Sequence, residues 1–542
     1  AALKLLLSGR AVTGDTGRKL GLIDVIEADD LLKTAVAHAR RIAESAGELR
    51  RSSTRRDRLG QGTAFLESVA QHRTAANASP LDAPIRMIEC IEAALLLPYD
   101  IGRSMEQAVY SDLVSSEHSK SLRHIFAAER NLQAASKWEG SVSSRTLSAV
   151  TVVGARGIGA EVAVQCLDAG FNVTVAEVTE GALEEGVGRI IGHFDARVTA
   201  GSMSEDAVEQ VLDRMHAVSG YDKVAEADIV IDPSPALTKV RVAALDATMK
   251  AGAVLLLGSE SVELGTVAEM TSRTSDVVGM RFFPGIKKNR LVELAAIDNT
   301  SQKAIATARA LARKLDRLIV ETAPGKDGIG THIMEALHAA ADLCLEDGAR
   351  IAQIDAALKD WGLPFGSFAW RDILGIKRYS APRGIEGQRG GGIDSVLVAV
   401  GRLGISTGQG YYTYQQRGRP GVPDPEVEKM VEADRVAKQV KLRGLSDGEV
   451  RARCVAAMAG AGAHLLVEGI AKRPADIDMV ALHGLGFARR TGGVMFAADL
   501  MGLDHVHKLL TEMAGESPRI SPPPAMMQDL LNSGQGLSGL NG

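Results

Sequence analysis

A glycine-rich turn between an apolar run and a helical pattern is the clearest candidate for chemistry in the sequence. Residues 149–153 read AVTVV, and residues 154–159 read GARGIG, in which Gly154, Gly157 and Gly159 precede a helical pattern. Glycines in such a strand-turn-helix unit let the backbone approach a diphosphate, which the helix N-terminus then binds. The spacing therefore predicts a dinucleotide-binding turn.

Two charged side chains near this turn bear on which dinucleotide could bind. Glu177 ends a second predicted strand, FNVTVAE, where such folds place the acid that contacts the ribose. A carboxylate there favours NAD over NADP, because it repels a 2'-phosphate. Arg156 takes the place of the middle glycine, and we expect it to obstruct the usual cofactor pose. The alternative is that its guanidinium pairs with the phosphate. NAD is the candidate cofactor, with Arg156 as the argument against its binding.

A second motif lies further along the chain. Residues 277–294 read VVGMRFFPGIKKNRLVEL, which resembles the active-site signature of 3-hydroxyacyl-CoA dehydrogenases with Arg281 in place of the catalytic histidine. Oxidation of a secondary alcohol needs a base, and histidine suits this step because its pKa lies near working pH. Arginine stays protonated and cannot accept that proton. Glu293 matches the glutamate that orients the family's histidine.

Other family positions also differ. The segment AVLLLGSESVELGTVAEM resembles the family's ILATNTSTLDVDEIA, and it places Gly258 and Glu260 where the family has an Asn and a Ser in the substrate pocket. Thr331 takes the place of the Asn that opens the first helix of the C-terminal domain. The adjacent His332 replaces an Arg, and we expect it to cap the helix or to lie on the surface rather than to act as a base.

The cofactor side of the resemblance is altered as well. ADIVIDPSPALTK ends in Lys239, as the family's DLVIEAVPE…K segment does, but it is about two residues shorter and has Asp232 in place of a glutamate. Together these changes predict a degenerate dehydrogenase site. We expect Arg281 to pair with Glu260 and Glu293 there, because an unpaired charge in a former pocket would cost several kcal/mol.

Resemblances outside this region complete the predicted fold. Residues 1–45, AALKLLLSGR onward, resemble the C-terminal end of a crotonase domain, whose catalytic carboxylates lie upstream, and charged and apolar positions at helical spacing predict a helical linker over 46–146. LCLEDGARIAQIDAALKDWGLPFGSF recurs loosely as LLVEGIAKRPADIDMVALHGLGFARRTGG. We therefore expect an α/β Rossmann-type domain over 147–325, followed by two tandem all-α dehydrogenase C-terminal domains over 326–425 and 426–542.

Composition limits the classes of function. The 542 residues carry a net charge of -5 with only 4% aromatic residues, which argues against a nucleic-acid surface. We see no apolar run that would span a membrane, no secretory signal and no peroxisomal C-terminal tripeptide. The four cysteines form no CxxC pair, as in reduced cytosolic proteins, and we assign no metal site. The predicted location is the cytoplasm, and the predicted partners are small molecules.

The order of these parts resembles that of the bifunctional β-oxidation enzymes, the multifunctional enzyme type 1 group. That family hydrates 2-enoyl-CoA in its crotonase part and oxidises the product with NAD in its dehydrogenase part, so the resemblance implies a CoA thioester as ligand and a monomer. We expect an acyl-CoA enzyme whose activity resides in an upstream crotonase part. The alternatives are an active dehydrogenase that uses Glu293 or a water as base, and a non-catalytic binding or assembly module.

Overall fold

The computed structural model of the chain describes residues 2–45, 51–54, 62–137, 142–234, 237–258, 263–285, 289–325, 327–380, 392–416 and 418–541. The chain forms two compact units, Ala1–Lys120 and Ser121–Gly542. The division between them falls inside the segment that was predicted to be a helical linker. Each unit is described separately below.

The first unit is helical in the residues described. Its helices are α1 (Ala2–Ser8), α2 (Gly14–Leu20), α3 (Leu31–Glu44), α4 (Gly62–Asn77), α5 (Ala83–Leu96) and α6 (Tyr99–Ser115), with a short 3-10 turn at Ser52–Thr54. Its small core joins Leu3 of α1 to Val69 and Ala76 of α4 and Ile88 of α5. None of the 14 residues of α3 is buried, although the helix is amphipathic. The helices α4 to α6 agree with the predicted helical character of this segment.

The second unit contains an eight-stranded sheet. Its strands are β1 (Ala149–Val153), β2 (Asn172–Glu177), β3 (Met215–Ser219), β4 (Ile229–Asp232), β5 (Val254–Leu257), β6 (Val277–Phe282), β7 (Leu291–Ala295) and β8 (Leu318–Thr322). Their order is β3-β2-β1-β4-β5-β6-β7-β8, and all neighbours are parallel except β6 and β7. The predicted Rossmann-type fold is confirmed.

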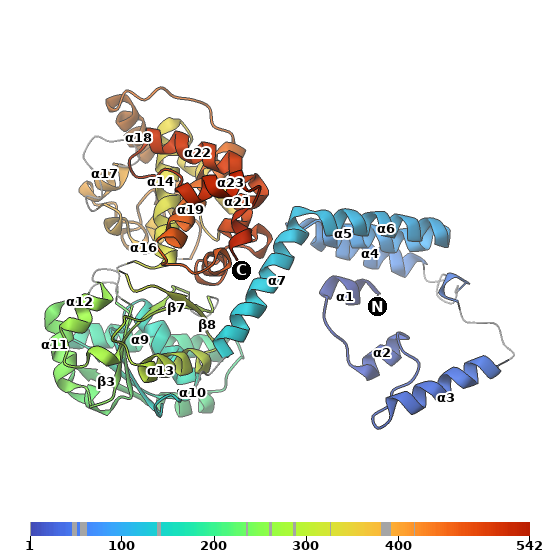
Figure 1. Cartoon of the computed structure of the whole chain (residues 1–542), viewed down its shortest axis with the longest axis horizontal. Helices are drawn as coiled ribbons and strands as arrows, with labels where there is room; N and C mark the ends of the chain where they lie inside the picture. Colours follow the sequence, from blue (N-terminus) through green and yellow to red (C-terminus); the bar gives the residue numbers. More distant parts are fainter. Residues whose placement is uncertain are drawn as a thin grey trace. The chain divides into compact units, whose positions relative to one another are not determined.

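Helices cover both faces of this sheet (Figure 1). One face packs against α8 (Ile158–Asp168), α9 (Glu180–Thr199), α10 (Glu205–Leu212) and α13 (Gln302–Lys314), and the other packs against α11 (Lys239–Thr248) and α12 (Leu264–Glu269). Strands that are buried on both faces need nearly continuous apolar sequences. The strands β4 and β5, IVID and VLLL, are accordingly buried at every position. Their carboxyl ends lie at one edge of the sheet, where the glycine turn also lies.

The rest of the second unit is helical. It comprises α7 (Glu117–Lys137) from Ser121 onward, α14 (Ile329–Asp347), α15 (Ile351–Trp361), α16 (Ser367–Leu374), α17 (Ile393–Ala399), α18 (Pro425–Ala437), α19 (Asp447–Val467), α20 (Pro474–Met479), α21 (Val494–Met501), α22 (Leu503–Glu516) and α23 (Ala525–Asn532), with a two-stranded ribbon of β9 (Tyr412–Thr413) and β10 (Val422–Pro423). The central helices α14 and α19 pack side by side (Figure 1). Among the described helices, α19 alone is long and apolar enough to cross a membrane, but most of it is buried as a core helix.

The sequence repeat corresponds to a repeated hydrogen-bond arrangement. Asp355 accepts hydrogen bonds from the backbone N–H groups of Phe368 and Ala369 at the start of α16, at 3.0 and 2.9 Å. Asp478 accepts one in the same way from Met495 at the start of α21, at 2.7 Å. Both aspartates come from the Ile-Asp pairs that the repeat aligns. Each helix that follows is therefore capped by a carboxylate from the helix before it.

Candidate active site

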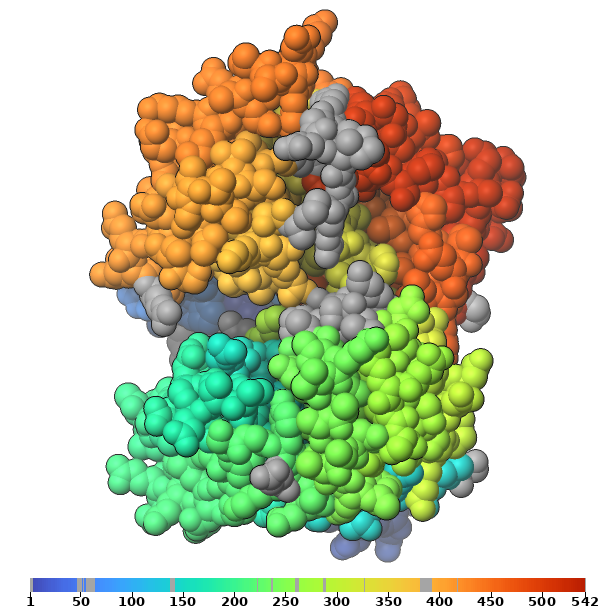
Figure 2. Space-filling model, turned by 90° about the vertical axis from the view of Figure 1, so that its left-hand side faces the viewer, coloured from blue at the N-terminus to red at the C-terminus, as the bar shows by residue number. Residues whose placement is uncertain are grey.

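A cavity of about 670 Å³ lies where the Rossmann-type part meets the helical part. The boundary between these parts crosses Figure 2, between the residues coloured cyan to light green and those coloured orange to red. One wall comes from β6 and the loop after it, Arg281 to Pro284. The opposite wall comes from one face of α14 and from α16. The cavity therefore contains the positions that the resemblance assigns to the dehydrogenase site.

Arg281 and Glu293 face each other across the antiparallel pair of β6 and β7. The Arg281 Nη1 atom lies 3.8 Å from Glu293 Oε2, and Nη2 donates a hydrogen bond to the Gly325 carbonyl at 3.0 Å. The two side chains are only 12% and 1% exposed. Opposite charges at directly facing positions stabilise a strand pair. The structure thus contains the predicted pairing with Glu293, while Glu260 lies outside the described residues.

Glu293 also holds the first helix of the helical part. Its Oε1 atom accepts a hydrogen bond from the backbone N–H of Gly330, in the first turn of α14, at 2.9 Å. The N-cap residue of this helix is Gly328, which has no side chain to do so. A Cβ atom on Gly328 would lie 1.8 Å from Glu293 Oε2. Glu293 therefore caps α14 from the neighbouring sheet, and its negative charge suits the positive end of the helix dipole.

The face of α14 towards the cavity carries Thr331 and His338. His332 does not line this cavity, and its Nδ1 atom lies 2.9 Å from the Gly328 carbonyl oxygen one turn back. His332 is therefore bound to its own helix, as expected. His338 was missed by sequence reasoning. Its place seven residues after Thr331, on the same helical face, is the signal that could have identified it.

His338 is buried, with 2% exposure, and its Nδ1 atom lies 2.7 Å from Ser367 Oγ. Burial lowers the pKa of His338 well below its ordinary range, and the nearby Arg371 guanidinium lowers it further. Arg371 is itself fixed by ion pairs to Asp342 and Asp394, both at 2.8 Å. The imidazole at this end of the cavity is therefore neutral at physiological pH.

On the cofactor side, the glycine turn has the geometry that the motif predicts. Gly154 and Gly157 have φ values of 86° and 63°, in the region that favours glycine. A Cβ atom on Gly159 would lie 1.7 Å from the Gly154 carbonyl oxygen. All three glycines are thus needed to form the turn itself. Their presence explains the backbone shape whether or not a dinucleotide binds.

The charged side chains around the turn differ in exposure, because one is buried and two face solvent. Glu177 is buried, and its Oε1 atom accepts a hydrogen bond from the backbone N–H of Ala155 at 2.8 Å. Arg156 is exposed on the turn, and Lys239 is exposed at the first position of α11. The predicted ribose acid therefore contacts the glycine turn, and both predicted cations face solvent.

The carboxyl ends of β4 and β5 carry two further positions of interest, Asp232 and Gly258. Asp232, fully buried at the end of β4, accepts a hydrogen bond from the Ser234 N–H and lies 3.3 Å from Arg241 Nη1. Burial raises the pKa of the Asp232 carboxyl, and Arg241 opposes this shift. A Cβ atom on Gly258 would lie 3.0 Å from the Cα atom of Pro233. A side chain at position 258 would therefore need the loop after β4 to shift by a few tenths of an ångström.

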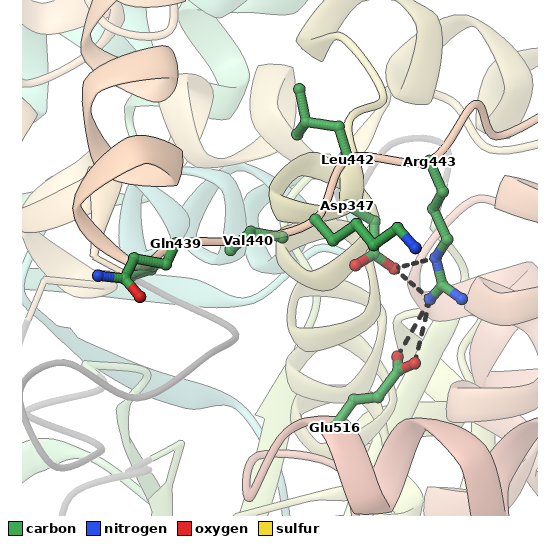
Figure 3. A pocket seen from close by; sticks show the side chains of 8 residues that line it. Asp347, Gln439, Val440, Leu442, Arg443 and Glu516 are labelled. Atoms are coloured by element: carbon green, nitrogen blue, oxygen red, sulfur yellow. Dashed lines mark hydrogen bonds and ion pairs between the residues drawn. The ribbon is translucent and has the colours of Figure 1, made fainter.

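A second pocket, of about 470 Å³, lies at the other end of α14 (Figure 3). Arg443 points between Asp347 and Glu516 and hydrogen-bonds to both. Arg453 bonds to the same two carboxylates. These charges neutralise one another and join α14, α19 and α22. The pocket is therefore explained as part of the helical scaffold.

Comparisons with known proteins agree with this architecture. Residues 149–324 match the NAD binding domain of 3-hydroxyacyl-CoA dehydrogenase, and residues 329–414 match its C-terminal domain. The peroxisomal bifunctional enzyme of Danio rerio is 27% identical over 97% of this chain and 76% of its own length. The glyoxysomal fatty acid beta-oxidation multifunctional protein MFP-a of Brassica napus is 25% identical over 99% and 76%.

Solved structures show the same fold. The 3-hydroxybutyryl-CoA dehydrogenase of Escherichia coli K12 superposes with a TM-score of 0.59 at 19% identity, over 72% of this chain and all of that one. The dehydrogenase part of multifunctional enzyme 1 from C. elegans gives 0.51 at 18% identity, over 73% of this chain and 94% of that one. Both share the Rossmann-type sheet and the helical part.

These comparisons identify similar proteins and correct one expectation. The cytoplasmic location that we predicted from the cysteines and the lack of targeting signals is wrong, because the relatives are named as peroxisomal or glyoxysomal proteins. Such composition signals do not distinguish between compartments that both keep cysteines reduced. The order of domains, in contrast, is shared along almost the whole chain. The chain thus carries matches to both domains of 3-hydroxyacyl-CoA dehydrogenase and is similar, along almost its whole length, to bifunctional and multifunctional enzymes of fatty-acid β-oxidation.

Proposed function

We propose that the second unit binds acyl-CoA thioesters but has lost the base that 3-hydroxyacyl-CoA dehydrogenases use. The observation that carries this proposal is the Arg281–Glu293 pair in the wall of the cavity. A guanidinium there cannot accept the hydroxyl proton of a 3-hydroxyacyl group. Glu293 caps α14 and pairs with Arg281, so we assign it a structural role and not that of the base.

The expected loss of dehydrogenase rate follows from the role of the missing catalytic base. General base catalysis contributes roughly 10²- to 10⁴-fold to a rate. We infer that hydride transfer in this cavity is slower than in a histidine-bearing relative by at least the factor for the base.

The cofactor site supports the same proposal. Glu177 accepts a hydrogen bond from the Ala155 N–H, within the turn that would bind the diphosphate. Arg156 occupies the position where the backbone of related folds approaches the cofactor. We infer weak NAD binding, because the exposed Arg156 side chain stands where the diphosphate would approach the turn.

The cavity itself suits a thioester ligand. Its volume of about 670 Å³ is in the ordinary range for small-molecule sites, and Phe283, Met334 and Trp370 give it apolar walls. In this family, hydration of 2-enoyl-CoA belongs to the crotonase part, whose C-terminal end residues 1–45 resemble. We infer that the chain acts in acyl-CoA metabolism as the thioester-binding part of such an enzyme, in the peroxisomal or glyoxysomal setting named for its relatives.

The test is NADH oxidation with acetoacetyl-CoA, measured for the unmodified chain beside an Arg281→His variant. We expect no turnover by the unmodified chain. Recovery of measurable turnover in the variant would show that Arg281 is what blocks the chemistry. Steady turnover by the unmodified chain would overturn the proposal.

One observation favours a second candidate, an active NAD-dependent dehydrogenase. Residues 149–324 match an NAD binding domain, and Glu293 is kept at the position of the family's glutamate. A water held by Glu293 would then have to serve as base. This candidate predicts that Glu293→Gln abolishes a measurable activity, whereas our proposal predicts that there is no activity to lose.

A further inference from the structure

The candidate cavity has a buried end and an exposed end. At the buried end, the side chains of Arg281 and Glu293 are almost fully covered. At the other end Leu374 lines the cavity while 37% exposed, and Arg378 also lines it as an exposed residue. We call this exposed end, lined by Leu374 and Arg378, the mouth of the cavity. A ligand whose reactive group lies beside Arg281 can reach solvent through this mouth.

The helix α14 connects the two ends. Gly330 donates its backbone hydrogen bond to Glu293 at the buried end. His338 lies roughly 12 Å further along the helix axis, and its ring stands 4.9 Å from that of Tyr379, which follows Arg378 directly. A long flexible arm, such as CoA has between its thioester and its nucleotide, can span this distance.

An aromatic surface lies at the mouth. Trp370 lines the cavity from α16, one turn before Leu374. The Phe365 ring packs edge-on against the Trp370 ring, with the ring centroids 5.8 Å apart and an interplanar angle of 72°, and Phe365 is 44% exposed. Nucleotide bases stack on aromatic side chains, because every base has a π-face. Phe365 and Trp370 therefore offer a surface on which a base can stack.

Two consecutive cations lie next to this surface. Lys377 and Arg378 are both exposed, in the 3-10 turn that follows α16. Burial lowers the pKa of His338, and nearby guanidinium groups that include Arg378 lower it further, so the charge of Arg378 lies close to the cavity wall on α14. Guanidinium and ammonium groups bind phosphate oxygens through charge-assisted hydrogen bonds. The mouth thus combines a stacking surface with cations that suit phosphate.

The charges also indicate on which side of Arg378 a phosphate would lie. Glu335 of α14 lines the cavity, and its carboxylate would repel a phosphate inside it. Lys377 is exposed beside Arg378, towards solvent. This arrangement favours a ligand whose uncharged arm enters the cavity and whose phosphates stay at the mouth.

We propose that the mouth of the cavity recognises the nucleotide part of CoA, with the adenine stacked on Phe365 and Trp370 and the phosphates bound by Lys377 and Arg378. The proposal deepens the proposed function and rests on it, because it requires that the thioester occupies the buried end. It predicts that the chain selects CoA thioesters over the same acyl groups carried on pantetheine alone.

The test compares octanoyl-CoA with octanoyl-pantetheine by titration calorimetry on the full chain. We expect octanoyl-CoA to bind about 10- to 100-fold more tightly, because a stacked base and charge-assisted hydrogen bonds each strengthen binding several-fold. This preference should decrease as the salt concentration rises, because salt screens charge contacts at an exposed site. Equal affinities of the two thioesters at low salt would overturn the proposal.

Variants of exposed residues identify the contacts. Arg378→Ala and Phe365→Ala should each reduce the ratio of the two affinities by about 5-fold, through loss of a phosphate contact and of stacking respectively. The matched control is Lys508→Ala, which removes an exposed cation of α22 and should leave the ratio unchanged. A ratio that stays the same in both Arg378→Ala and Phe365→Ala would place the nucleotide on another surface and overturn the proposal.

The outcomes separate this proposal from the proposed function. Binding of both thioesters with equal affinity would remove the nucleotide site and leave the thioester site standing. If neither thioester binds to the unmodified chain, the proposed function fails, and the nucleotide site fails with it.

Discussion

The two helical repeats of the second unit share a scaffold and differ in how their first helix begins. In α14 the N-terminus has no cap of its own and is held by Glu293 of β7. In α19 the N-terminus carries a capping box, in which Ser446 and Glu449 bond to each other's backbone N–H groups. The first helix of the first repeat is thus capped from the Rossmann-type sheet, whereas the first helix of the second repeat is capped locally.

This difference explains why the first helix of one repeat alone lines the candidate site, to which the second repeat contributes Leu485. Because α14 starts on the sheet, one of its faces remains against the cavity, from Gly330 to His338. The helix α19 lies in the core instead, packed between α14, α15, α21 and α22. The first helix of one repeat therefore gives a binding surface, whereas the first helix of the other gives a structural core. Three predictions test this comparison, and the first concerns what the repeats share.

Removal of the shared caps should have the largest effect. Asp355→Ala and Asp478→Ala each leave two backbone N–H groups without this acceptor, one of a buried and one of a half-buried residue: Phe368 and Ala369, or Met495 and Phe496. Each also removes one side-chain contact, from Tyr412 to Asp355 or from His124 to Asp478. We expect each variant to lower the free energy of unfolding by about 4 kcal/mol, measured by urea denaturation. The matched Asp→Asn variants keep one acceptor and should lose about half as much. A large loss in one repeat with none in the other would refute their equivalence.

Removal of the carboxylate that caps α14 from the sheet should have the next largest effect. Glu293→Ala removes the carboxylate that pairs with Arg281 and the acceptor for the Gly330 N–H at the start of α14. We expect a loss of about 3 kcal/mol in the free energy of unfolding.

The control for this change is Glu449→Ala in the second repeat. Glu449 is exposed at the start of α19, and its removal should cost about 1 kcal/mol or less. Equal losses in Glu293→Ala and Glu449→Ala would show that the sheet does not hold α14 more strongly than a local cap holds α19.

A pH effect specific to the first repeat should be somewhat smaller. Burial raises the pKa of Asp372 from 3.8 to about 6, although the N–H groups of Tyr411 and Tyr412 and the hydroxyl of Tyr414 lower it. The folded chain therefore holds this proton more tightly than the unfolded chain does. The resulting stabilisation is complete below about pH 4 and is lost as the pH rises to about 6, by about 3 kcal/mol or less.

This dependence is measured as the difference in unfolding free energy between the unmodified chain and Asp372→Asn across that pH window. The variant lacks the titrating group, so the difference should change steadily from about pH 4 to about pH 6. A constant difference across the window would mean that Asp372 titrates at its ordinary value.

The structural features that the sequence predicts are those set by local sequence pattern. The AVTVV run and the glycines after it form a strand and a turn because their φ values and packing are fixed within a few residues. The helical repeat is visible because Ile-Asp pairs recur at the same place in each copy. The pairing of Arg281 with Glu293 is predictable because both lie in one short segment that forms adjacent strands.

The remaining features depend on contacts between distant segments. Nothing near Glu293 in the sequence shows that it caps a helix that begins at Ile329. The contact of Gly258 with Pro233 depends on the length of a loop in another strand connection. His338 looks like any polar residue on an apolar helix until Ser367, from the next repeat element, is seen to bind only one of its nitrogens.

The central claim is that the cavity keeps the dehydrogenase fold without a base for the reaction. The most direct measurement is a single-turnover experiment in which the unmodified chain, at an NADH concentration that saturates it in a direct binding titration, is in large excess over acetoacetyl-CoA and the NADH absorbance is followed over hours. This arrangement detects one slow hydride transfer per site that steady-state rates would miss. We predict no decrease in absorbance beyond that of NADH alone. A decrease equal to the acetoacetyl-CoA added would contradict the claim and show that another group in this cavity supplies the proton.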